Sequence, residues 1–207
     1  MGCGGVRMKM IAEDSQLVLI DFQEKLMPVI EHAEGVLEKA HVLAQAARAL
    51  MVPIWATEQN PSKLGANPLS WRSWCQQTLP KMHFSACDEG LIECLRPKPQ
   101  APAGNARSLP KHLQKPQSNQ PTRPQIVIAG CEAHICLLQT ALDLVDEEFE
   151  VFAVIDACGS RAQSSKDAAL DRLASAGVEL VTTEMVLFEW LETAEHEHFK
   201  SIQQLIV

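Results

Sequence analysis

The sequence predicts an α/β protein of three layers, in which helices cover both faces of a doubly wound, mostly parallel β-sheet. Short apolar runs that do not alternate with polar residues recur along the chain. Such runs are typical of strands buried on both faces of a parallel sheet. Longer stretches of helical pattern separate them, and this alternation implies right-handed crossovers and an open sheet.

The elements follow one another in this order. The first strand, 16–22, reads QLVLIDF and carries Asp21 near its end. Further strands are expected at 52–57 (VPIWAT), 125–130 (QIVIAG), 150–157 (EVFAVIDA) and 177–182 (GVELVT). Helices are expected at about 33–51, 133–147 and 164–176, and Gly177 is a typical stop for the last of them. In this architecture, functional sites form at the carboxyl ends of the strands.

Length and composition favour a single domain over residues 1–207, because the chain is long enough for one core and short for two. A segment at about 96–124 departs from the strand and helix pattern. It contains seven prolines and no apolar run, so it cannot bury enough surface to offset the entropy of ordering it. We interpret it as a Pro/Gln-rich surface insertion, and as a spacer rather than a lid or an oligomer-contact arm.

Charge and cysteine content restrict the partners. The net charge of −8 disfavours nucleic acid and anionic membrane surfaces, which would repel the chain. A small-molecule substrate or a protein partner is expected instead. No apolar run approaches the roughly 18 residues that would span a bilayer, and no signal peptide is visible. The seven cysteines do not form a regular disulfide framework. We therefore expect a reduced, cytoplasmic protein.

Asp21 is the first candidate site residue, because a carboxylate at the end of a buried strand needs a partner. It could equally cap a neighbouring loop. A role in binding magnesium or accepting phosphate is less well supported, since its neighbours supply no second carboxylate.

Cys136 is the second candidate. It falls in the first turn of the helix after strand 125–130, where the helix dipole should make a thiol easier to ionise. The alternative is an inert, buried cysteine. A zinc site with Cys131 and His134 is disfavoured, because no second matched pair of ligands is present and the side chains of His134 and Cys136 should point to different faces. We expect no metal and no cofactor.

Lys81 gains significance only through these two residues. A lysine can stabilise a carboxylate and a thiolate together if the fold brings all three into one pocket.

Three ordered motifs carry a family resemblance: a strand ending in Asp-Phe-Gln (21–23), Lys-x-x-Phe-Ser-Ala (81–86) and Gly-x-Glu-Ala-His-x-Cys (130–136). Together they resemble the isochorismatase-like cysteine hydrolase family over about residues 17–181. The stretch TEQNPSKLG (57–65) is similar to the branch of isochorismatase domain-containing proteins whose substrate is uncharacterised.

The resemblance implies a catalytic group of Asp21, Lys81 and Cys136. It also implies a cis peptide bond between Cys131 and Glu132, which would aim the backbone N–H of Glu132 at the same point as that of Cys136 and form an oxyanion hole. Family members commonly form dimers or larger rings, so a homo-oligomer is expected.

Two departures narrow the activity. The Asp-x-His metal site of the family's nicotinamidases has no counterpart in the histidine-free stretch ATEQNPSKLGANPLSW. The namesake isochorismatases lack the cysteine, so Cys136 argues against their reaction. The resemblance therefore implies hydrolysis of a carbon–nitrogen bond in a small amide or ureido compound through a thioester.

Five residues flank the motifs and are expected to line the substrate pocket, although ordinary core packing would explain them as well: Phe22, Gln59, Trp71, Phe84 and Ile135. Two further functions stay open. The chain could be a catalytically weak binding or scaffold protein of the same fold, or a thiol redox sensor in which Cys131 resolves an oxidised Cys136.

Overall fold

The computed structural model describes residues 9–96 and 123–206. Its centre is a six-stranded, all-parallel sheet with the strand order β3-β2-β1-β4-β5-β6. The strands are β1 (Ser15–Ile20), β2 (Ile54–Gln59), β3 (Gln77–Lys81), β4 (Gln125–Cys131), β5 (Glu150–Gly159) and β6 (Glu179–Val181). The order reverses between β1 and β4, so this pair marks the topological switch point of a doubly wound sheet.

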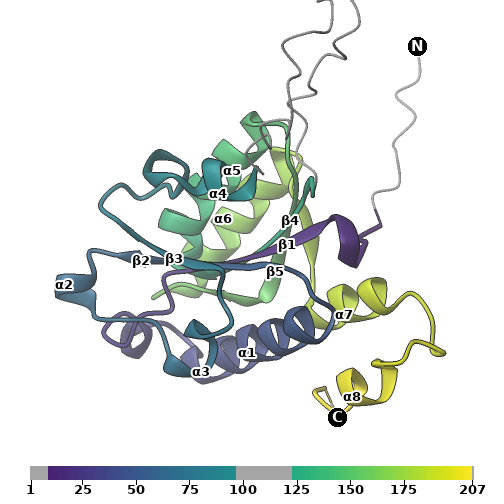
Figure 1. The fold of residues 1–207 in the computed structure, drawn as a ribbon. Coiled ribbons are helices and arrows are strands. Elements are labelled where there is room, and N and C mark those ends of the chain that lie inside the picture. The colour runs from purple at the N-terminus through teal and green to yellow at the C-terminus, as the bar shows by residue number, and fades with distance from the viewer. Residues whose placement is uncertain (1–8, 97–122, 207) are drawn as a thin grey trace, which may run out of the picture.

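Helices cover both faces of the sheet and complete the three expected layers (Figure 1). The helices α1 (Ala33–Ala49) and α7 (Thr183–Leu191) lie on one face, and α4 (Leu91–Leu95), α5 (Leu138–Asp146) and α6 (Gln163–Ser175) lie on the other. Three short helices complete the described chain: α2 (Pro61–Leu64), α3 (Leu69–Arg72) and α8 (Phe199–Gln203).

Two hydrophobic cores result, one on each side of the sheet. Strand β1 contributes to both, because successive side chains of a strand point to opposite faces. Leu17 and Leu19 belong to the core under α1 and α7, which we call the α1 core, whereas Val18 and Ile20 belong to the core under α5, the α5 core. All six residues of β1 are buried, as the unbroken apolar run predicted.

The strand at Gln77–Lys81 was missing from the sequence prediction. Its sequence, QTLPK, has one large aliphatic residue and a proline, and it pairs only with β2 at the edge of the sheet, where proline is tolerated. Helix α7 was also missed. Thr182 caps it by accepting a hydrogen bond from the backbone N–H of Met185 at 3.3 Å.

The proline-rich insertion lies outside the described residues over 97–122. Its two flanks meet at the amino-terminal edge of the sheet, where the Gln16 side chain donates to the carbonyl oxygens of Leu95 and Arg123, each at 3.0 Å. The flanks therefore lie at the edge opposite the carboxyl ends of the strands.

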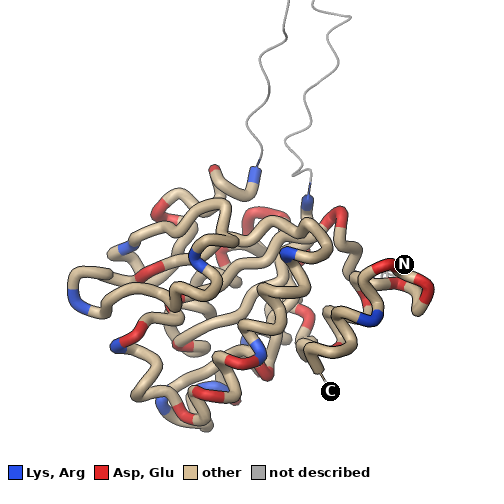
Figure 2. Tube along the Cα trace, turned by 60° about the horizontal axis from the view of Figure 1, so that its bottom comes forward, with Lys and Arg blue, Asp and Glu red and all other residues tan. Residues whose placement is uncertain are grey.

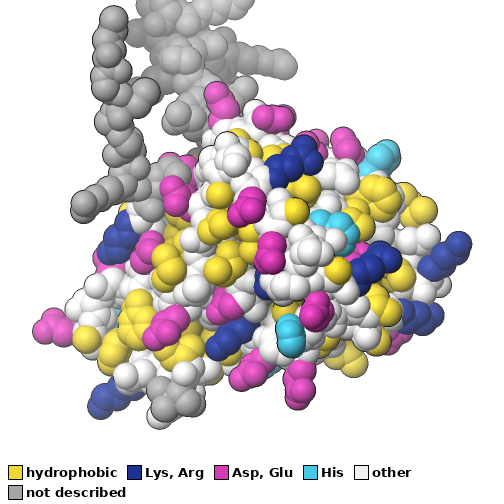
Figure 3. Space-filling view, turned by 180° about the vertical axis from the view of Figure 1, so that it is seen from behind, with side chains coloured by type: hydrophobic (Ala, Val, Ile, Leu, Met, Phe, Trp, Pro, Cys, Tyr) yellow, Lys and Arg dark blue, Asp and Glu magenta, His cyan; other side chains and the backbone are white. Residues whose placement is uncertain are grey.

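No helix among the described residues is long and apolar enough to cross a membrane. Basic positions are scattered along the trace rather than gathered on one face (Figure 2). Acidic side chains are spread over the whole of the face seen in Figure 3. This distribution agrees with the net charge of −8.

Candidate active site

The candidate site lies at the switch point. Asp21 directly follows β1, Lys81 ends β3, and Cys136 follows β4, so three carboxyl ends of parallel strands supply the three side chains. All three residues are buried, with Asp21 0%, Lys81 2% and Cys136 6% exposed.

Asp21 is held by two partners. Its Oδ2 atom lies 2.8 Å from Lys81 Nζ, and its Oδ1 atom accepts a hydrogen bond from Thr57 Oγ1 at 2.7 Å. Its backbone has a φ of 51°, a left-handed conformation that aspartate adopts more readily than most residues. The carboxylate is therefore fixed in direction as well as paired in charge.

Lys81 has an acceptor for each hydrogen of its ammonium group. Its Nζ atom donates to Gln59 Oε1 at 2.6 Å and to the carbonyl oxygens of Phe84 and His83 at 3.0 and 3.4 Å, in addition to its ion pair with Asp21. Full satisfaction matters here, because an unpaired ammonium in such a buried place would be costly.

Glu89 fixes the loop that carries the Phe84 carbonyl. Its Oε1 atom accepts from the backbone N–H groups of Met82 and His83 at 2.9 and 3.0 Å, and it pairs with His83 Nδ1 at 2.8 Å. These hydrogen bonds lower the pKa of Glu89 to about 2. The hydrogen bonds to Glu89 therefore stabilise the loop whose Phe84 carbonyl oxygen accepts from Lys81.

Cys136 shares a partner with Lys81. Its Sγ atom lies 3.8 Å from Gln59 Oε1, the atom that also accepts from Lys81. Burial is the main cause that raises the pKa of the Cys136 thiol to about 12, and the Asp21 carboxylate raises it further, whereas Lys81 opposes the shift. Both charges therefore act on the thiol, in opposite directions.

The raised pKa corrects the expectation that the thiol is easily ionised at a helix start. The segment Ala133–Leu137 is a single π-helical turn that precedes α5, and removal of the sulfur from water outweighs the attraction of Lys81. The free protein therefore keeps Cys136 protonated at neutral pH.

The turn before Cys136 has unusual backbone geometry. The bond between Cys131 and Glu132 is cis, at the position that the family resemblance implied. The Glu132 carboxylate binds Arg161 through Nη2 at 2.6 Å and Nε at 3.0 Å, and this pairing lowers the pKa of Glu132. Arg161, in the loop after β5, thus fixes the direction in which the chain turns after β4.

The expected pocket residues separate into two groups. Gln59 lies in the site, and Ile135 packs on the α5 core that contains Cys136. Phe84 contributes its carbonyl oxygen to Lys81, while its side chain is 52% exposed. Phe22 and Trp71 lie in the α1 core instead, with ring centroids 5.3 Å apart.

The sequence interpretation missed two residues that support the site. Thr57 orients Asp21, and its place at the end of the expected strand 52–57 was a usable signal, by the same rule that selected Asp21. Gln23 is fully buried; its Oε1 atom accepts from the Gln59 backbone N–H at 2.8 Å, and its Nε2 atom donates to the Gly65 carbonyl oxygen at 2.7 Å. No local pattern indicates that partner set.

Cys131 and His134 take other partners. Cys131 packs in the α1 core, with its sulfur 3.8 Å from Met27 Sδ, whereas Cys136 packs in the α5 core. This arrangement gives no support to Cys131 as a resolving thiol. His134 Nδ1 lies 3.0 Å from Ser160 Oγ. In the part of the chain that the structure describes, no three His, Cys, Asp or Glu side chains are arranged to hold a metal ion.

Comparison with known proteins shows the family of the chain. The sequence model of the isochorismatase domain family matches residues 15–185. Isochorismatase domain-containing protein 2 of Danio rerio is 34% identical over 198 residues, which cover 96% of this chain and 89% of that protein.

Solved structures show the same fold. MAR1 ribonuclease from Caenorhabditis elegans is similar with a TM-score of 0.78 and 25% identity, over 96% of this chain and 92% of that one. The YcaC gene product of Escherichia coli, described as an octameric hydrolase of unknown specificity, is similar with a TM-score of 0.76 and 18% identity, over 96% and 94% of the two chains.

The fold, a doubly wound parallel sheet with a cysteine at its switch point, is that of the isochorismatase-like proteins. The chain belongs to the isochorismatase domain family.

Proposed function

We propose that the protein is a cysteine hydrolase that cleaves a carbon–nitrogen bond of a small amide or ureido compound through a Cys136 thioester. The observation that carries the proposal is that Cys136 Sγ and Lys81 Nζ share Gln59 Oε1 as a partner, while Lys81 Nζ lies 2.8 Å from Asp21 Oδ2. A nucleophile beside a base that a third group orients is the arrangement that covalent catalysis requires.

Asp21 acts as the base and then as the acid. As the sulfur attacks the carbonyl carbon, the thiol proton passes to Asp21, because a thiol with a pKa of about 12 does not ionise ahead of the attack. When the tetrahedral intermediate collapses, the carbon–nitrogen bond breaks and Asp21 returns this proton to the leaving nitrogen. Water then gives a proton to Asp21 and attacks the thioester, and the sulfur leaves and regains its proton.

Lys81 and the backbone supply the positive potential. Lys81 pairs with Asp21 at an Nζ–Oδ2 distance of 2.8 Å, and it stabilises negative charge on the sulfur. The N–H groups of Glu132 and Cys136 act as the oxyanion hole. The N–H of Cys136 lies in the first turn of the helical segment, where N–H groups have no partner within the helix. Each such donor contributes about 3 to 4 kcal/mol to transition-state stabilisation.

We also propose the class of partner. The substrate is a small molecule, because only a small group fits beside three residues that are each at most 6% exposed. The name ribonuclease belongs to the Caenorhabditis elegans protein. RNA is a poor partner for this chain, whose net charge is −8 and whose basic positions are scattered (Figure 2). We further propose a cytoplasmic homo-oligomer, in which the apolar side chains of Met82 and Phe84, 66% and 52% exposed, contribute to the contact between subunits.

A turnover screen tests the proposal. Release of ammonia or amine would be measured over small amides, ureas, carbamoyl compounds and hydroxamates, with wild-type protein and with Cys136→Ala, Asp21→Asn and Cys75→Ala. Cys75 is a half-buried cysteine whose Sγ atom contacts the Trp71 carbonyl oxygen, outside the site, and serves as the matched control. We expect Cys136→Ala and Asp21→Asn to lose at least about 1,000-fold in rate, and Cys75→Ala to retain it. Near-normal turnover by either site variant would reject the mechanism. Absence of Cys136-dependent turnover over the whole panel would favour a binding protein of this fold.

A further inference from the structure

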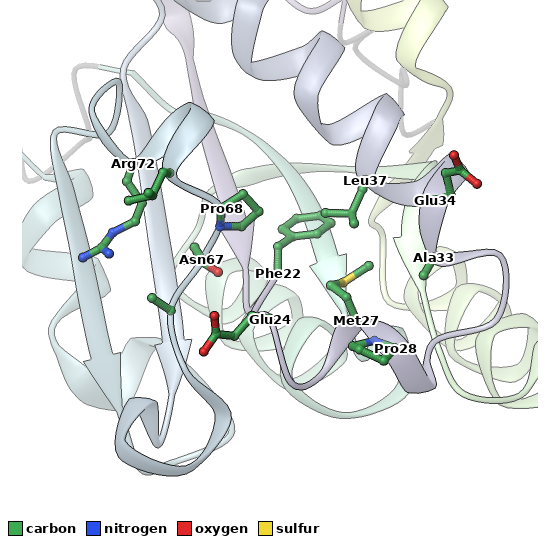
Figure 4. Close-up of a pocket in the computed structure, with 12 residues that line it drawn as sticks. Phe22, Glu24, Met27, Pro28, Ala33, Glu34, Leu37, Asn67, Pro68 and Arg72 are labelled. Atoms are coloured by element: carbon green, nitrogen blue, oxygen red, sulfur yellow. The ribbon is translucent and has the colours of Figure 1, made fainter.

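A cavity borders Phe22, the residue that follows Asp21 (Figure 4). Its volume is about 690 Å³, and it is bounded by Phe22, the short turn at Met27–Val29, the start of α1 and helix α3. Asp21, Lys81 and Cys136 lie outside its lining. The proposed reaction therefore makes no use of it.

The cavity has the size and the lining of a small-molecule site. Such sites typically measure about 300 to 1,000 Å³ and combine apolar walls with a few polar groups. The apolar walls here come mainly from Phe22, Met27, Pro28, Leu37, Pro68 and Leu69. The polar groups are Asn67 and the charged side chains of Glu24, Glu34 and Arg72.

Asn67 presents an unused acceptor. The residue is only 3% exposed, and its Nδ2 atom donates to the Thr57 carbonyl oxygen at 2.9 Å. Because that bond requires the nitrogen to face Thr57, the amide orientation is fixed and Oδ1 must face the other way. The Oδ1 atom is buried and accepts no hydrogen bond from any described residue. Figure 4 shows this oxygen turned toward the space between Phe22 and Glu24.

The unused acceptor indicates a missing donor. A buried carbonyl oxygen without a partner is destabilising, and such groups are rare in native proteins. The Asn67 backbone N–H is already engaged, because it donates to Glu58 Oε1 at 2.8 Å. The side chain therefore cannot turn away to water without breaking the bond to Thr57.

Glu24 adds a second acceptor near Asn67. Its carboxylate is folded over Gly65, where a Cβ atom would come within 2.3 Å of Glu24 Oε1, and the absence of a side chain at Gly65 allows this approach. In Figure 4 this carboxylate lies on the same side of the cavity as Asn67. Two acceptors beside an apolar space match a ligand that donates N–H groups.

We propose that this cavity binds a small, flat, mainly apolar molecule that carries an N–H donor, with the donor on Asn67 Oδ1 and the apolar body against Phe22 and Leu37. Such a ligand has the chemistry of an aromatic amine or an indole. The inference rests on the cavity and on Asn67, and it stands whether or not Cys136 is a nucleophile.

Indole and benzofuran form a matched pair of probes, because oxygen replaces the N–H of indole in a ring system of nearly the same shape. Neither compound has a bond that the proposed hydrolase would cleave. Each would be titrated into ¹⁵N-labelled full-length protein and followed by NMR, including the side-chain amide signals of Asn67. We expect saturable binding of indole with a Kd of about 1 mM or tighter. Benzofuran should bind about 3- to 10-fold more weakly.

Two alanines on α1 supply matched variants. Ala33 lines the cavity, whereas Ala49, at the other end of α1, lines a separate cavity of about 340 Å³ next to Trp74 and α8. Ala33→Phe should weaken indole binding at least about 10-fold by filling the space, and Ala49→Phe should leave it unchanged. Thermal melting of both variants would show that each is folded, and the wild-type probe comparison does not depend on either.

Several results would overturn the proposal. Equal affinity for indole and benzofuran would show an apolar surface without a donor requirement. Shifts that do not saturate, or that leave the Asn67 amide signals unmoved, would show that water fills the cavity. A change in oligomeric state caused by Ala33→Phe alone would show that a second copy of the chain covers it.

Discussion

Asp21 and Lys81 form an ion pair whose two side chains are each 0% exposed. Burial removes both charges from water, and their attraction offsets this cost only because Thr57, Gln59 and the Phe84 carbonyl satisfy the remaining hydrogen-bonding groups. Removal of one partner leaves a buried, unpaired charge, which lowers the free energy of unfolding more than removal of both partners does.

The first prediction concerns this asymmetry. Lys81→Met should lower the free energy of unfolding by about 3 to 5 kcal/mol, because it leaves the Asp21 carboxylate buried and unpaired. The double variant Asp21→Asn with Lys81→Met should regain most of this loss. Urea unfolding followed by circular dichroism measures both. Equal stability of the wild-type protein and Lys81→Met would contradict the buried pair.

The second prediction concerns the Cys136 thiol. A pKa of about 12 leaves the Cys136 thiol almost entirely neutral at pH 7. Because the shift is upward, the neutral thiol is favoured below its unfolded pKa, and the thiolate gains as pH rises through about 12. Alkylation of Cys136 by iodoacetamide in the free protein should therefore be slow at pH 6 to 7 and should still rise above pH 9. Peptide mapping by mass spectrometry follows the labelling, with urea-unfolded protein as the control. A plateau below pH 7 would reveal a preformed thiolate.

At the scale of the elements, the contact between β1 and β4 positions Asp21 relative to the Glu132 turn. Gly130 has a φ of 147°, and a Cβ atom on it would lie 2.2 Å from the Ile20 carbonyl oxygen. The two backbones thus approach closely, one residue before Asp21 on one strand and just before the Glu132 turn on the other. Glycine at position 130 is required by this approach.

The third prediction follows from that contact. Gly130→Ala should lower the free energy of unfolding by at least about 2 kcal/mol, since the added methyl group meets backbone rather than a flexible side chain. Gly35→Ala is the matched control. Gly35 lies within α1 with open space where its Cβ would be, so this change should stabilise the protein by about 0.5 to 1 kcal/mol. Thermal unfolding of both variants measures the difference. A neutral Gly130→Ala would show that β1 and β4 are further apart.

Buried elements were easier to predict from the sequence than elements at the edge of the sheet. The central strands β1, β4 and β5 are unbroken apolar runs, and the expected ranges lie within two residues of their observed ends. Strand β3 was missed because an edge strand needs apolar side chains on fewer sides. Its sequence, QTLPK, shows no clear alternation of apolar and polar residues and contains a proline. The π-helical turn at Ala133–Leu137 was expected to be regular helix, since no residue pattern distinguishes the two.

At the scale of the whole molecule, the switch point brings together residues separated by up to 115 positions. The convergence of Asp21, Lys81 and Cys136 was predictable, because the order of the motifs matched a known fold and carboxyl ends of parallel strands meet at one edge. The pocket walls were harder to predict. Which face of the sheet a residue joins depends on the turn after each strand, and Phe22 and Trp71 turned to the α1 core. The thiol pKa also required the final burial of Cys136.

The fourth prediction concerns assembly. One chain has a mass of 22.8 kDa, and its surface exposes several large apolar residues, including Met51 at 84% and Met82 at 66%. Burial of such side chains between subunits would stabilise an oligomer. Size-exclusion chromatography with light scattering should give a multiple of the chain mass, and Met82→Glu should reduce it. A monomer mass at micromolar concentration would exclude a stable homo-oligomer.

The most direct test of the central claim is the mass of the protein during turnover. Wild-type protein mixed with a compound from the turnover screen would be quenched in acid and weighed intact. The thioester mechanism predicts a gain equal to the substrate minus its leaving amine, located by fragmentation on Cys136 and absent from Cys136→Ala. An acyl group found on another residue, or substrate consumed by Cys136→Ala at the wild-type rate, would contradict it.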